Sequence, residues 1–504
     1  MITIVYSTHK DENYNNKFKQ HLIQTSGLKD VQVIEYVNHN QFSLSQVYNS
    51  GITESIYDIV VCCHNDIKLE KNWGKKLLED FSKNPEFGII GKAGSCYFSQ
   101  SGVYWERMSQ TMVGQVYHHP EGSKKWLSRY SVKSPNITPV VTIDGLFISF
   151  DKTKIKHQFD ETIGRFHFYD HLFCMPNYLD GVGIGVTSSF DITHESVGQP
   201  NQEFWDSREK FIQKWGGSLP LELEPKIFIP EIVGDKKQKK LGKVAVVIPT
   251  KGKVEMLYEC VKSFYEKSNS ELFDVFIADT GSTDDEKDQI REQIVTLGNV
   301  KLIEYDYYNF AKINNDVVNN HVDDSYEFIL FSNNDIKILN DVITGMSLVY
   351  TKDPKAGTVG CRLHFGNGTI QHDGVFLGYS NTKQSFSVGH NGLGSHYNYQ
   401  NGIRNIFGVT GGLLMIRKKL FQKLGGFNEK YISCFEDVEL NIMSITNGYK
   451  NYINSDCVSY HYESTTRNED PDNLKKLQQD YVENLFPCIT SNVDKLRNYI
   501  TIVE

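Results

Sequence analysis

Two runs of β-branched residues open two regions in which apolar strands alternate with amphipathic helices. The first run is Ile2–Tyr6, and the second is Val244–Ile248. Residues Val254–Tyr265, which follow the second run after Pro249-Thr250, carry their apolar side chains at helical spacing. A strand followed by such a helix is the first step of an α/β sheet, so the pattern predicts two α/β domains.

A repeated set of landmarks indicates that the two regions are related. Asn65-Asp66-Ile67-Lys68 recurs as Asn334-Asp335-Ile336-Lys337, an offset of 269 residues. Each copy follows an apolar strand and precedes an amphipathic helix and a glycine-containing strand. Further along, an Asp and a His stand 24 residues apart in both regions: Asp170 with His194, and Asp437 with His461. Four landmarks in one order predict that the halves are divergent copies of one domain.

Composition shifts mark the domain boundaries. Leu221–Leu241 contains two prolines, a glycine and a lysine-rich patch, which is typical of a linker. We therefore expect a first domain at 1–225, a linker at 226–242, a second domain at 243–469 and a helical tail at 470–504. The amphipathic stretch Leu474–Leu485 in that tail is consistent with packing on the domains, with an oligomer contact or with a membrane surface.

Composition also narrows the class of protein. The 504 residues are 39 % apolar and 23 % charged, which is ordinary for globular domains. The net charge of −9 offers no basic excess, so nucleic acid is not an expected partner. Nine cysteines without a CxxC pair fit a reducing compartment, and no signal peptide or membrane-spanning run is visible. We expect a soluble cytoplasmic protein, with attachment to the inner face of the membrane left open.

Two strand ends in the second region carry polar groups suited to a nucleotide. The strand Phe273–Ala278 leads into Asp279-Thr-Gly-Ser, and acids at this place in open α/β sheets bind nucleotides. The same residues are equally suited to capping a turn and a helix. The strand before Asn333-Asn-Asp335 delivers amide and carboxylate oxygens that suit a divalent cation, although such residues also dominate ordinary turns.

Acids at the start of a helix are the candidates for proton transfer. Glu436, Asp437 and Glu439 begin an amphipathic stretch, where they would complement the helix dipole or supply a general base. His461 follows a strand 24 residues later. A lone histidine is usually structural, but its recurrence at His194 favours a function.

In order and spacing these strings resemble the family 2 glycosyltransferases. The strings are Val246-Val-Ile-Pro-Thr250, Asp279-Thr-Gly-Ser-Thr-Asp284, Asn309-Phe-Ala-Lys-Ile-Asn-Asn315, Asn333-Asn-Asp335, Gly425-Gly-Phe-Asn-Glu429, Glu436-Asp437 and His461. The likeness covers residues 243–467. It is nearest to bacterial rhamnosyltransferase-like members that build O-antigen and capsule, which carry strings like Gln371-His-Asp-Gly374.

The resemblance implies an α/β protein of two tandem GT-A domains, with assigned roles. In the second domain, Thr250, Asp279 and Asn334 would contact the nucleotide. Asp335 and His461 would hold Mg²⁺ or Mn²⁺. Asp437, with Glu436 beside it, would deprotonate the acceptor in an inverting displacement. Asn333 stands where the metal-binding motif usually begins with an acid, which leaves less negative charge for the cation.

The first domain carries a fainter set of the same residues. By the same likeness, Thr8 and Asn65 would bind nucleotide, Asp66 and His194 the metal, and Asp170 would be the base. Asp144-Gly145 is aligned with Gly411-Gly412. No Asp-x-Gly-Ser string follows the second strand, where the nearest acid is Glu35.

The implied function is a bifunctional glycosyltransferase of surface polysaccharide synthesis. Its donors would be UDP-, GDP- or dTDP-sugars, and its acceptor a glycan or lipid-linked glycan. Two alternatives stay open: a single active second domain with a glycan-binding first domain, and a binding protein without transfer. We also expect Gly366–Asn405 to form an acceptor-facing loop in which Tyr379, Tyr397 and Tyr399 stack on sugars, or else a surface loop without a ligand.

Overall fold

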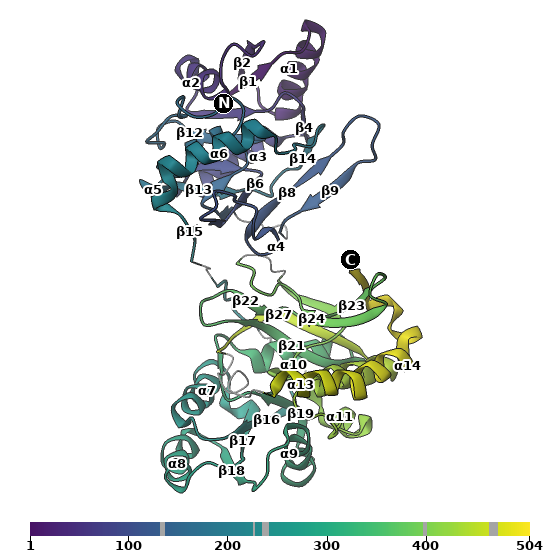
Figure 1. Cartoon of the computed structure of the whole chain (residues 1–504). Helices are drawn as coiled ribbons and strands as arrows, with labels where there is room; N and C mark the ends of the chain where they lie inside the picture. The colour runs from purple at the N-terminus through teal and green to yellow at the C-terminus, as the bar shows by residue number, and fades with distance from the viewer. Residues whose placement is uncertain (132–136, 225–226, 234–240, 397–400, 463–471, 504) are drawn as a thin grey trace. The chain divides into compact units, whose positions relative to one another are not determined.

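The computed structural model describes residues 1–131, 137–224, 227–233, 241–396, 401–462 and 472–503 (Figure 1). The chain divides into two compact units, one built on Met1–Glu224 and the other on Pro225–Ser395 and Tyr399–Glu504. Each unit has its own sheet and its own cores.

The first unit has a seven-stranded main sheet of order β10-β13-β5-β12-β3-β1-β2, a second sheet of order β11-β6-β8-β14-β4 with β9 beside β8, and a small sheet of β15 and β7. Its strands are β1 (Ile2–Thr8), β2 (Val31–Val37), β3 (Ile59–Cys63), β4 (Ile67–Leu69), β5 (Phe87–Gly91), β6 (Ala93–Ser95), β7 (Tyr97–Phe98), β8 (Met112–His118), β9 (Trp126–Arg129), β10 (Thr138–Pro139), β11 (Thr142–Ile143), β12 (Phe147–Asp151), β13 (Gly183–Val186), β14 (Ile192–His194) and β15 (Leu221–Glu222). Its α-helices are α1 (Glu12–Ser26), α2 (Leu44–Glu54), α3 (Trp73–Lys83), α4 (Met108–Thr111), α5 (Tyr169–Leu179) and α6 (Gln202–Trp215).

The second unit has a larger sheet whose main path runs β18-β17-β16-β19-β26-β21-β27-β20. Its strands are β16 (Lys243–Thr250), β17 (Phe273–Asp279), β18 (Val300–Glu304), β19 (Tyr326–Ser332), β20 (Ile336–Ile338), β21 (Ala356–His364), β22 (Ile370–His372), β23 (Val375–Ser380), β24 (Ser385–His390), β25 (Ile403–Ile406), β26 (Leu413–Arg417), β27 (Lys450–His461) and β28 (Ile500–Val503). Its α-helices are α7 (Val254–Lys267), α8 (Asp284–Gln289), α9 (Phe310–Asp316), α10 (Val342–Lys352), α11 (Lys418–Leu424), α12 (Glu436–Thr446), α13 (Asn473–Asp480) and α14 (Phe486–Leu496).

The two sheets share one topology. Strands β2-β1-β3-β12-β5-β13 correspond in order and direction to β17-β16-β19-β26-β21-β27. The prediction of two α/β domains of one kind is confirmed. One inner strand of each main sheet, β12 or β26, runs antiparallel to both of its neighbours.

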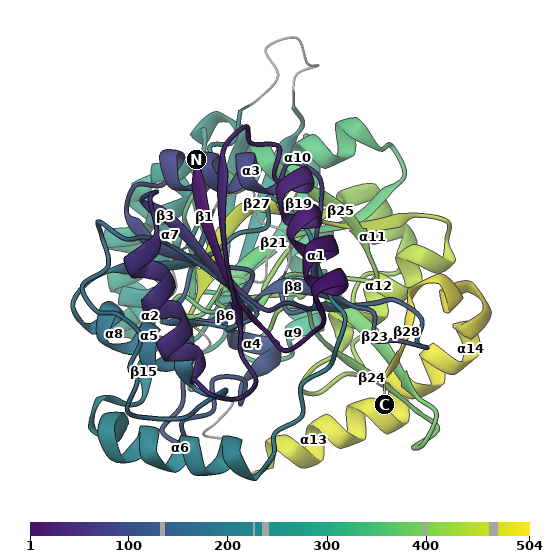
Figure 2. The same cartoon turned by 90° about the horizontal axis from the view of Figure 1, so that it is seen from above.

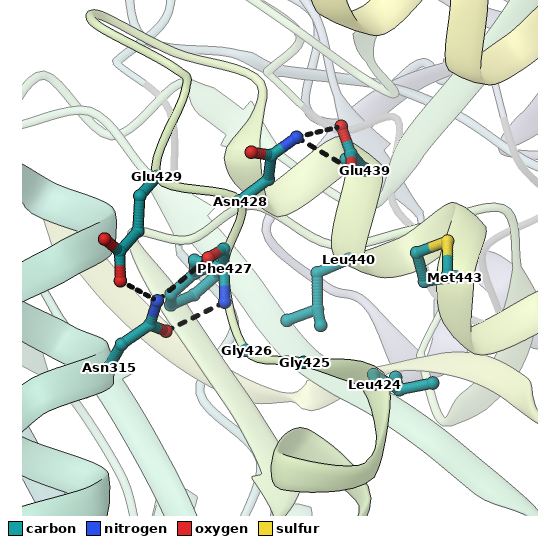
Figure 3. Close-up of a pocket in the computed structure, with 10 residues that line it drawn as sticks. All are labelled: Asn315, Leu424, Gly425, Gly426, Phe427, Asn428, Glu429, Glu439, Leu440 and Met443. Carbon is teal, nitrogen blue, oxygen red and sulfur yellow. Dashed lines mark hydrogen bonds between the residues drawn. The ribbon is translucent and has the colours of Figure 1, made fainter.

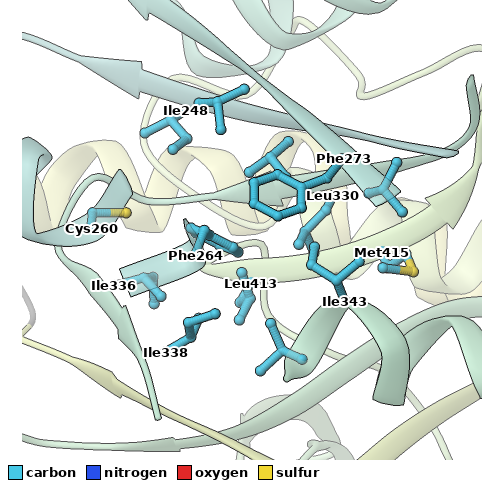
Figure 4. Close-up of a cluster of buried hydrophobic side chains, with 14 of the residues drawn as sticks. Ile248, Cys260, Phe264, Phe273, Leu330, Ile336, Ile338, Ile343, Leu413 and Met415 are labelled. Carbon is cyan, nitrogen blue, oxygen red and sulfur yellow. The ribbon is translucent and has the colours of Figure 1, made fainter. Parts of the chain in front are cut away.

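Buried strand faces explain why helices cover both sides of each sheet. In β16, Val244, Val246 and Ile248 enter one core, and Ala245 and Val247 enter the core on the opposite face. This alternation follows the period of two along a strand. Figure 4 shows the first of these cores, where Phe264 of α7 and Phe273 pack beside Leu330 and Met415.

The segment expected to be a loop, Gly366–Asn405, contains strands instead. β22 pairs with β21, and β23 and β24 form a hairpin. Tyr379 lies in β23 with its ring 4.9 Å from that of Phe386, so it packs within the hairpin. Tyr397 and Tyr399 lie outside the described residues. The loop expectation failed because strand pairing outweighed the Gly-, Asn- and Ser-rich composition.

The tail packs on the second unit. Leu485, Ile489 and Leu496 are buried with Val438 and Ile442 of α12. β28 pairs in parallel with β23, and Figure 2 shows α13 and α14, in yellow, beside this hairpin. Within the amphipathic stretch Leu474–Leu485 itself, Leu485 packs on this unit, whereas Leu474, Leu477 and Val482 are exposed, so the packing possibility holds for only part of it.

The predicted linker is described only in part. The Phe228 carbonyl accepts a hydrogen bond from Arg362 at 2.9 Å, and the Pro230 carbonyl accepts one from Asn340 at 2.8 Å. These bonds attach residues 227–233 to the second unit, whereas residues 234–240 lie outside the described part. Across the described ranges, no helix is both long and apolar enough to cross a membrane.

Candidate functional site

The same Thr–Asn hydrogen bond is present at the carboxyl ends of the central parallel strands in both main sheets. Asn334 Nδ2 donates to Thr250 Oγ1 at 2.9 Å, and Asn65 Nδ2 donates to Thr8 Oγ1 at 2.9 Å. Each threonine ends a first strand, and each asparagine follows the neighbouring parallel strand. The structure therefore brings together the predicted nucleotide residues of each unit at the carboxyl ends of the strands, where open sheets bind ligands.

Asp279 shapes the turn after β17. It is fully buried, and its carboxylate accepts hydrogen bonds from the Ser282 backbone N–H at 3.3 Å and from the Ser282 hydroxyl. Ser282 Oγ in turn accepts from the Gly252 N–H at 2.8 Å, which ties the two nucleotide-side loops together. The turn-capping interpretation holds for Asp279, and its contact with a nucleotide stays a prediction.

The first unit lacks this carboxylate. Thr250 pairs with Asp279 across β16 and β17, and Thr8 pairs with Val37 across β1 and β2. Val37, which is 57 % exposed, therefore occupies the place of Asp279. Glu35 lies inside the strand and accepts from the Tyr6 hydroxyl at 2.7 Å. The two units thus differ at the nucleotide end of the sheet.

In the second unit Asp335 and His461 face one another. His461 Nε2 lies 3.2 Å from Asp335 Oδ1 and 3.1 Å from Asn333 Nδ2. On the other side of the ring, His461 Nδ1 lies 2.6 Å from Gln371 Oε1. Because the Gln371 oxygen can only accept and the Asn333 amide nitrogen can only donate, the neutral ring carries its proton on Nδ1, and Nε2 accepts from Asn333. This is the tautomer that a metal-binding histidine requires, and Gln371 is a residue the sequence did not single out for this role.

The first unit has a three-residue group at the corresponding place. His64, Asp66 and His194 each offer a ligand atom, and these atoms all lie within 4.8 Å of one another. His194 Nε2 lies 3.4 Å from Asp66 Oδ1, and His64 Nδ1 lies 3.9 Å from the same oxygen. Burial alone would raise the pKa of Asp66, but the hydrogen bond and charge of His194 outweigh it and lower that pKa.

His64 was missed as a ligand candidate, although the His-Asn-Asp string was visible in the sequence. It stands where the second unit has Asn333. One carboxylate with imidazole nitrogens suits a divalent ion such as Mn²⁺. Of the three corresponding residues in the second unit, only Asp335 and His461 offer such ligand atoms, because the Asn333 atom facing His461 Nε2 is the amide nitrogen. Both groups fit a divalent cation.

Asp170 and Asp437 occupy matching positions at the amino ends of α5 and α12. Each is the second residue of its helix. Asp170 Oδ2 accepts from the Gly145 N–H at 2.8 Å, and Asp437 Oδ2 accepts from the Gly411 N–H at 2.6 Å. Burial raises the pKa of Asp170, which makes it a better proton acceptor near neutral pH. Glu436 is the buried first residue of α12.

The residue before each of these helices has an unusual backbone. Phe168 has φ of 65° and Phe435 has φ of 79°, in the left-handed region that large residues rarely adopt. Retaining this conformation in both units costs about 1–3 kcal/mol each. It turns the chain so that the following acid reaches the glycine loop.

The glycine pair Gly411-Gly412 of the second unit lies between Asp437 and His461. A Cβ on Gly411 would lie 3.3 Å from Asp437 Cβ, and one on Gly412 would lie 3.4 Å from His461 Cε1. The Asn333 N–H also donates to the Gly412 carbonyl at 2.9 Å. A side chain at Gly411 would therefore press on Asp437, whereas one at Gly412 would make an ordinary contact with His461.

The alignment of this loop with the first unit was wrong by one residue. Phe147 pairs with Cys63 as Leu413 pairs with Ser332, so Phe147 and Leu413 are equivalent positions. Two residues earlier, the equivalent of Gly411 is therefore Gly145 and not Asp144. A slip of one residue would put each side chain on the wrong face of the strand.

The Gly425–Glu429 string lines a cavity of about 360 Å³ in the second unit (Figure 3). Asn315 holds this loop, since its side chain exchanges two 2.9 Å hydrogen bonds with the Phe427 backbone and donates to Glu429 at 3.0 Å. On the other wall, Glu439 accepts from Asn428 at 3.0 Å. The sequence motifs 309–315 and 425–429 are therefore joined by hydrogen bonds in the structure.

The fold and the repeated polar groups define a tandem pair of nucleotide-sugar-transferase-like α/β domains. The chain belongs to the glycosyltransferases: residues 3–215 match the family described as "Glycosyltransferase like family", and residues 245–425 match "Glycosyl transferase family 2". The tandem GT-A organisation expected from the sequence is thus confirmed.

Two curated relatives are similar over about half of the chain. The O-antigen biosynthesis protein RfbC of Myxococcus xanthus is 28 % identical over 230 residues, which are 45 % of this chain and 18 % of that protein. The uncharacterized protein y4gI of Sinorhizobium fredii (strain NBRC 101917 / NGR234) is 25 % identical over 268 residues, 51 % of this chain and 28 % of that protein. The chain therefore spans less than a third of the length of either relative.

Solved structures give remote likenesses. GalNAc-T7 with UDP, GalNAc and Mn²⁺ has a TM-score of 0.37 at 12 % identity, covering 52 % of this chain and 55 % of that one. The mannosyltransferase PcManGT from Pyrobaculum calidifontis in complex with GDP-Man and Mn²⁺ has a TM-score of 0.33 at 15 % identity, covering 57 % and 80 %.

Proposed function

We propose that this chain is a bifunctional glycosyltransferase in which each unit moves a sugar from a nucleotide-sugar donor to a glycan acceptor. The observation that carries the proposal is the retention of three polar arrangements in both units: the Thr–Asn pair, the Asp–His pair and the Asp held by a glycine N–H. A domain kept only as a scaffold has no need for all three.

The geometry supports the following roles. Asp437 and Asp170 each use one lone pair of Oδ2 on a glycine N–H, and a carboxylate has further lone pairs to take the proton of an acceptor hydroxyl. Asp335 with His461, and Asp66 with His64 and His194, would hold the divalent cation. When bound, that cation supplies positive charge against the departing diphosphate. Attack from the base side opposite the diphosphate gives inversion at the sugar carbon.

The substrate class rests on the relatives. UDP-, GDP- or dTDP-sugars are the proposed donors, and a glycan or lipid-linked glycan of a surface polysaccharide is the proposed acceptor. The name of the Myxococcus xanthus relative, an O-antigen biosynthesis protein, supports this class. Val37 in the place of Asp279 supports a different donor preference in the first unit.

That same difference also favours a second candidate, in which the first unit binds glycan without transfer. The two candidates are separated by a panel of sugar nucleotides offered to the full chain with Mn²⁺ and a glycan acceptor. We expect two donors to be used. Asp335→Ala should reduce transfer from one of them by about 100-fold or more, and Asp66→Ala transfer from the other. Asp494→Ala, at an exposed tail residue, is the control. If only one donor is used and its transfer is unchanged in Asp66→Ala, only the second unit is an enzyme.

A further inference from the structure

A row of aromatic rings leads away from the metal group of the first unit. His194 on β14 pairs with His118 on β8, and His118 pairs with Trp126 on β9. Paired residues on neighbouring strands point to one face, so the three rings share a face. The ring centroids of His194 and His118 lie 5.9 Å apart, and those of His118 and Trp126 lie 5.4 Å apart at an interplanar angle of 23°.

The outer end of this row is accessible. Trp126 is 41 % exposed, and its indole stacks on His118 on one side only among the ring contacts of the described residues. A tryptophan of that exposure contributes little to a core, since burial is what makes large apolar rings stabilising. Its position beside a proposed ligand-binding group points to a ligand.

The second unit provides an internal comparison. The hairpin β23–β24 corresponds to β8–β9, because a glycine with φ of 103° stands four residues before the compared position in each, Gly114 inside β8 and Gly374 directly before β23. At the register of His118 and Trp126 the second unit has Gly378 paired with Ser387. A Cβ on Gly378 would come within 3.2 Å of Val503 on β28, so this place is covered by the tail. The fold therefore does not require the two rings.

We propose that Trp126, backed by His118, is the stacking surface for a pyranose ring of the acceptor glycan at the first unit. The C–H face of a pyranose is apolar and flat, and it packs on indole as another ring does. The cation group marks where the donor diphosphate binds, and Trp126 lies two ring spacings beyond it. A sugar at that distance belongs to the acceptor and not to the residue being transferred. This inference rests on the proposed function.

Titration calorimetry offers a direct test, because intrinsic fluorescence would lose its reporter in the Trp126 variants. The full chain is titrated with methyl pyranosides of gluco, galacto, manno and rhamno configuration, and separately with UDP, GDP and dTDP in the presence of Mn²⁺. The variants are Trp126→Ala, Trp126→Phe, which keeps a ring, and Trp205→Ala. Trp205, 42 % exposed on α6, is the matched control.

Trp126→Ala is expected to weaken binding of the responding pyranoside about 10-fold, Trp126→Phe much less, and Trp205→Ala not at all. The rise in melting temperature with nucleotide and Mn²⁺ should stay unchanged in all three. Equal pyranoside binding by Trp126→Ala and Trp205→Ala overturns the proposal. Loss of the nucleotide-dependent rise in Trp126→Ala also overturns it, because the ring would then be structural.

Two further outcomes separate this inference from the proposed function. If Trp126→Ala weakens binding of a sugar nucleotide but not of its nucleoside diphosphate, the stacked sugar is the donor's and the acceptor assignment is wrong. If the first unit transfers no sugar yet Trp126→Ala still loses the pyranoside, the stacking surface stands and the bifunctional proposal fails.

Discussion

Removing the Asp480 carboxylate should loosen the loop that precedes the proposed base of the second unit. Asp480, the last residue of α13, is fully buried. Its Oδ2 accepts hydrogen bonds from the backbone N–H groups of Ile432 at 3.1 Å, Ser433 at 2.6 Å and Cys434 at 3.1 Å. Phe435 and α12, which carries Asp437, follow directly.

The size of the effect follows from these three bonds. Leaving a buried N–H without an acceptor costs about 1–3 kcal/mol. Ile432 is 55 % exposed, so water can replace part of what is lost. We therefore expect Asp480→Ala to lower the free energy of unfolding of the second unit by about 3 kcal/mol, near the low end for three such groups. A displaced Asp437 should also lower transfer by the second unit about 10-fold or more.

The assay combines denaturant unfolding, amide hydrogen exchange at residues 432–434, and transfer by each unit. Asp494→Ala is the control, because Asp494 lies in the same tail with an 80 % exposed side chain paired only locally with Arg497. Transfer by the first unit should not change in either variant. If Asp480→Ala unfolds, exchanges and transfers as Asp494→Ala does, the tail carboxylate does not hold the loop.

Two further predictions concern the second unit. Replacing Gln371 with Ala removes the acceptor of His461 Nδ1, so Mn²⁺ affinity by calorimetry should fall about 10-fold or more, while Gln422→Ala, at an exposed site, should leave it unchanged. Burial and the charge of Arg362 lower the pKa of His364 to about 4, so protons bind the unfolded chain more tightly. The contribution of His364 to the free energy of unfolding should therefore be complete above pH 6.5 and fall as the pH falls towards 4, with about 2 kcal/mol lost at pH 5. In His364→Gln, the free energy of unfolding measured in urea should depend less on pH over this range. Unchanged metal binding in Gln371→Ala, or equal pH profiles of parent and His364→Gln, would refute the respective argument.

The duplicated sheet was predictable from the sequence because its landmarks are local. One residue separates the repeated Asn-Asp-Ile-Lys string from the end of β3 or β19, and the string runs into β4 or β20, so the offset of 269 residues also predicts the matching strand order. The proposed base was also visible, since an acid two residues into a helix stands out in sequence.

The contacts around the site were not predictable, because they join distant segments. Gln371 and His461 are 90 residues apart and meet because β22 and β27 both pair with β21. The one-residue error at Gly145 arose because the chains between β12 and the helix acid differ in length, a difference that only strand register reveals. Trp126 gave no periodic signal, and its place beside His194 depends on pairing across three strands.

The variants Asp170→Asn and Asp437→Asn together test whether both units transfer sugar. Asparagine keeps the shape and an oxygen that can accept the glycine N–H, but it cannot take a proton. Assayed as full chains with mixed donors and a glycan acceptor, the two proteins should each lose one of two distinct transfer steps by about 100-fold or more while donor binding persists. If Asp170→Asn makes the same products at the same rates as the parent, the first unit is not an enzyme and the bifunctional proposal is contradicted.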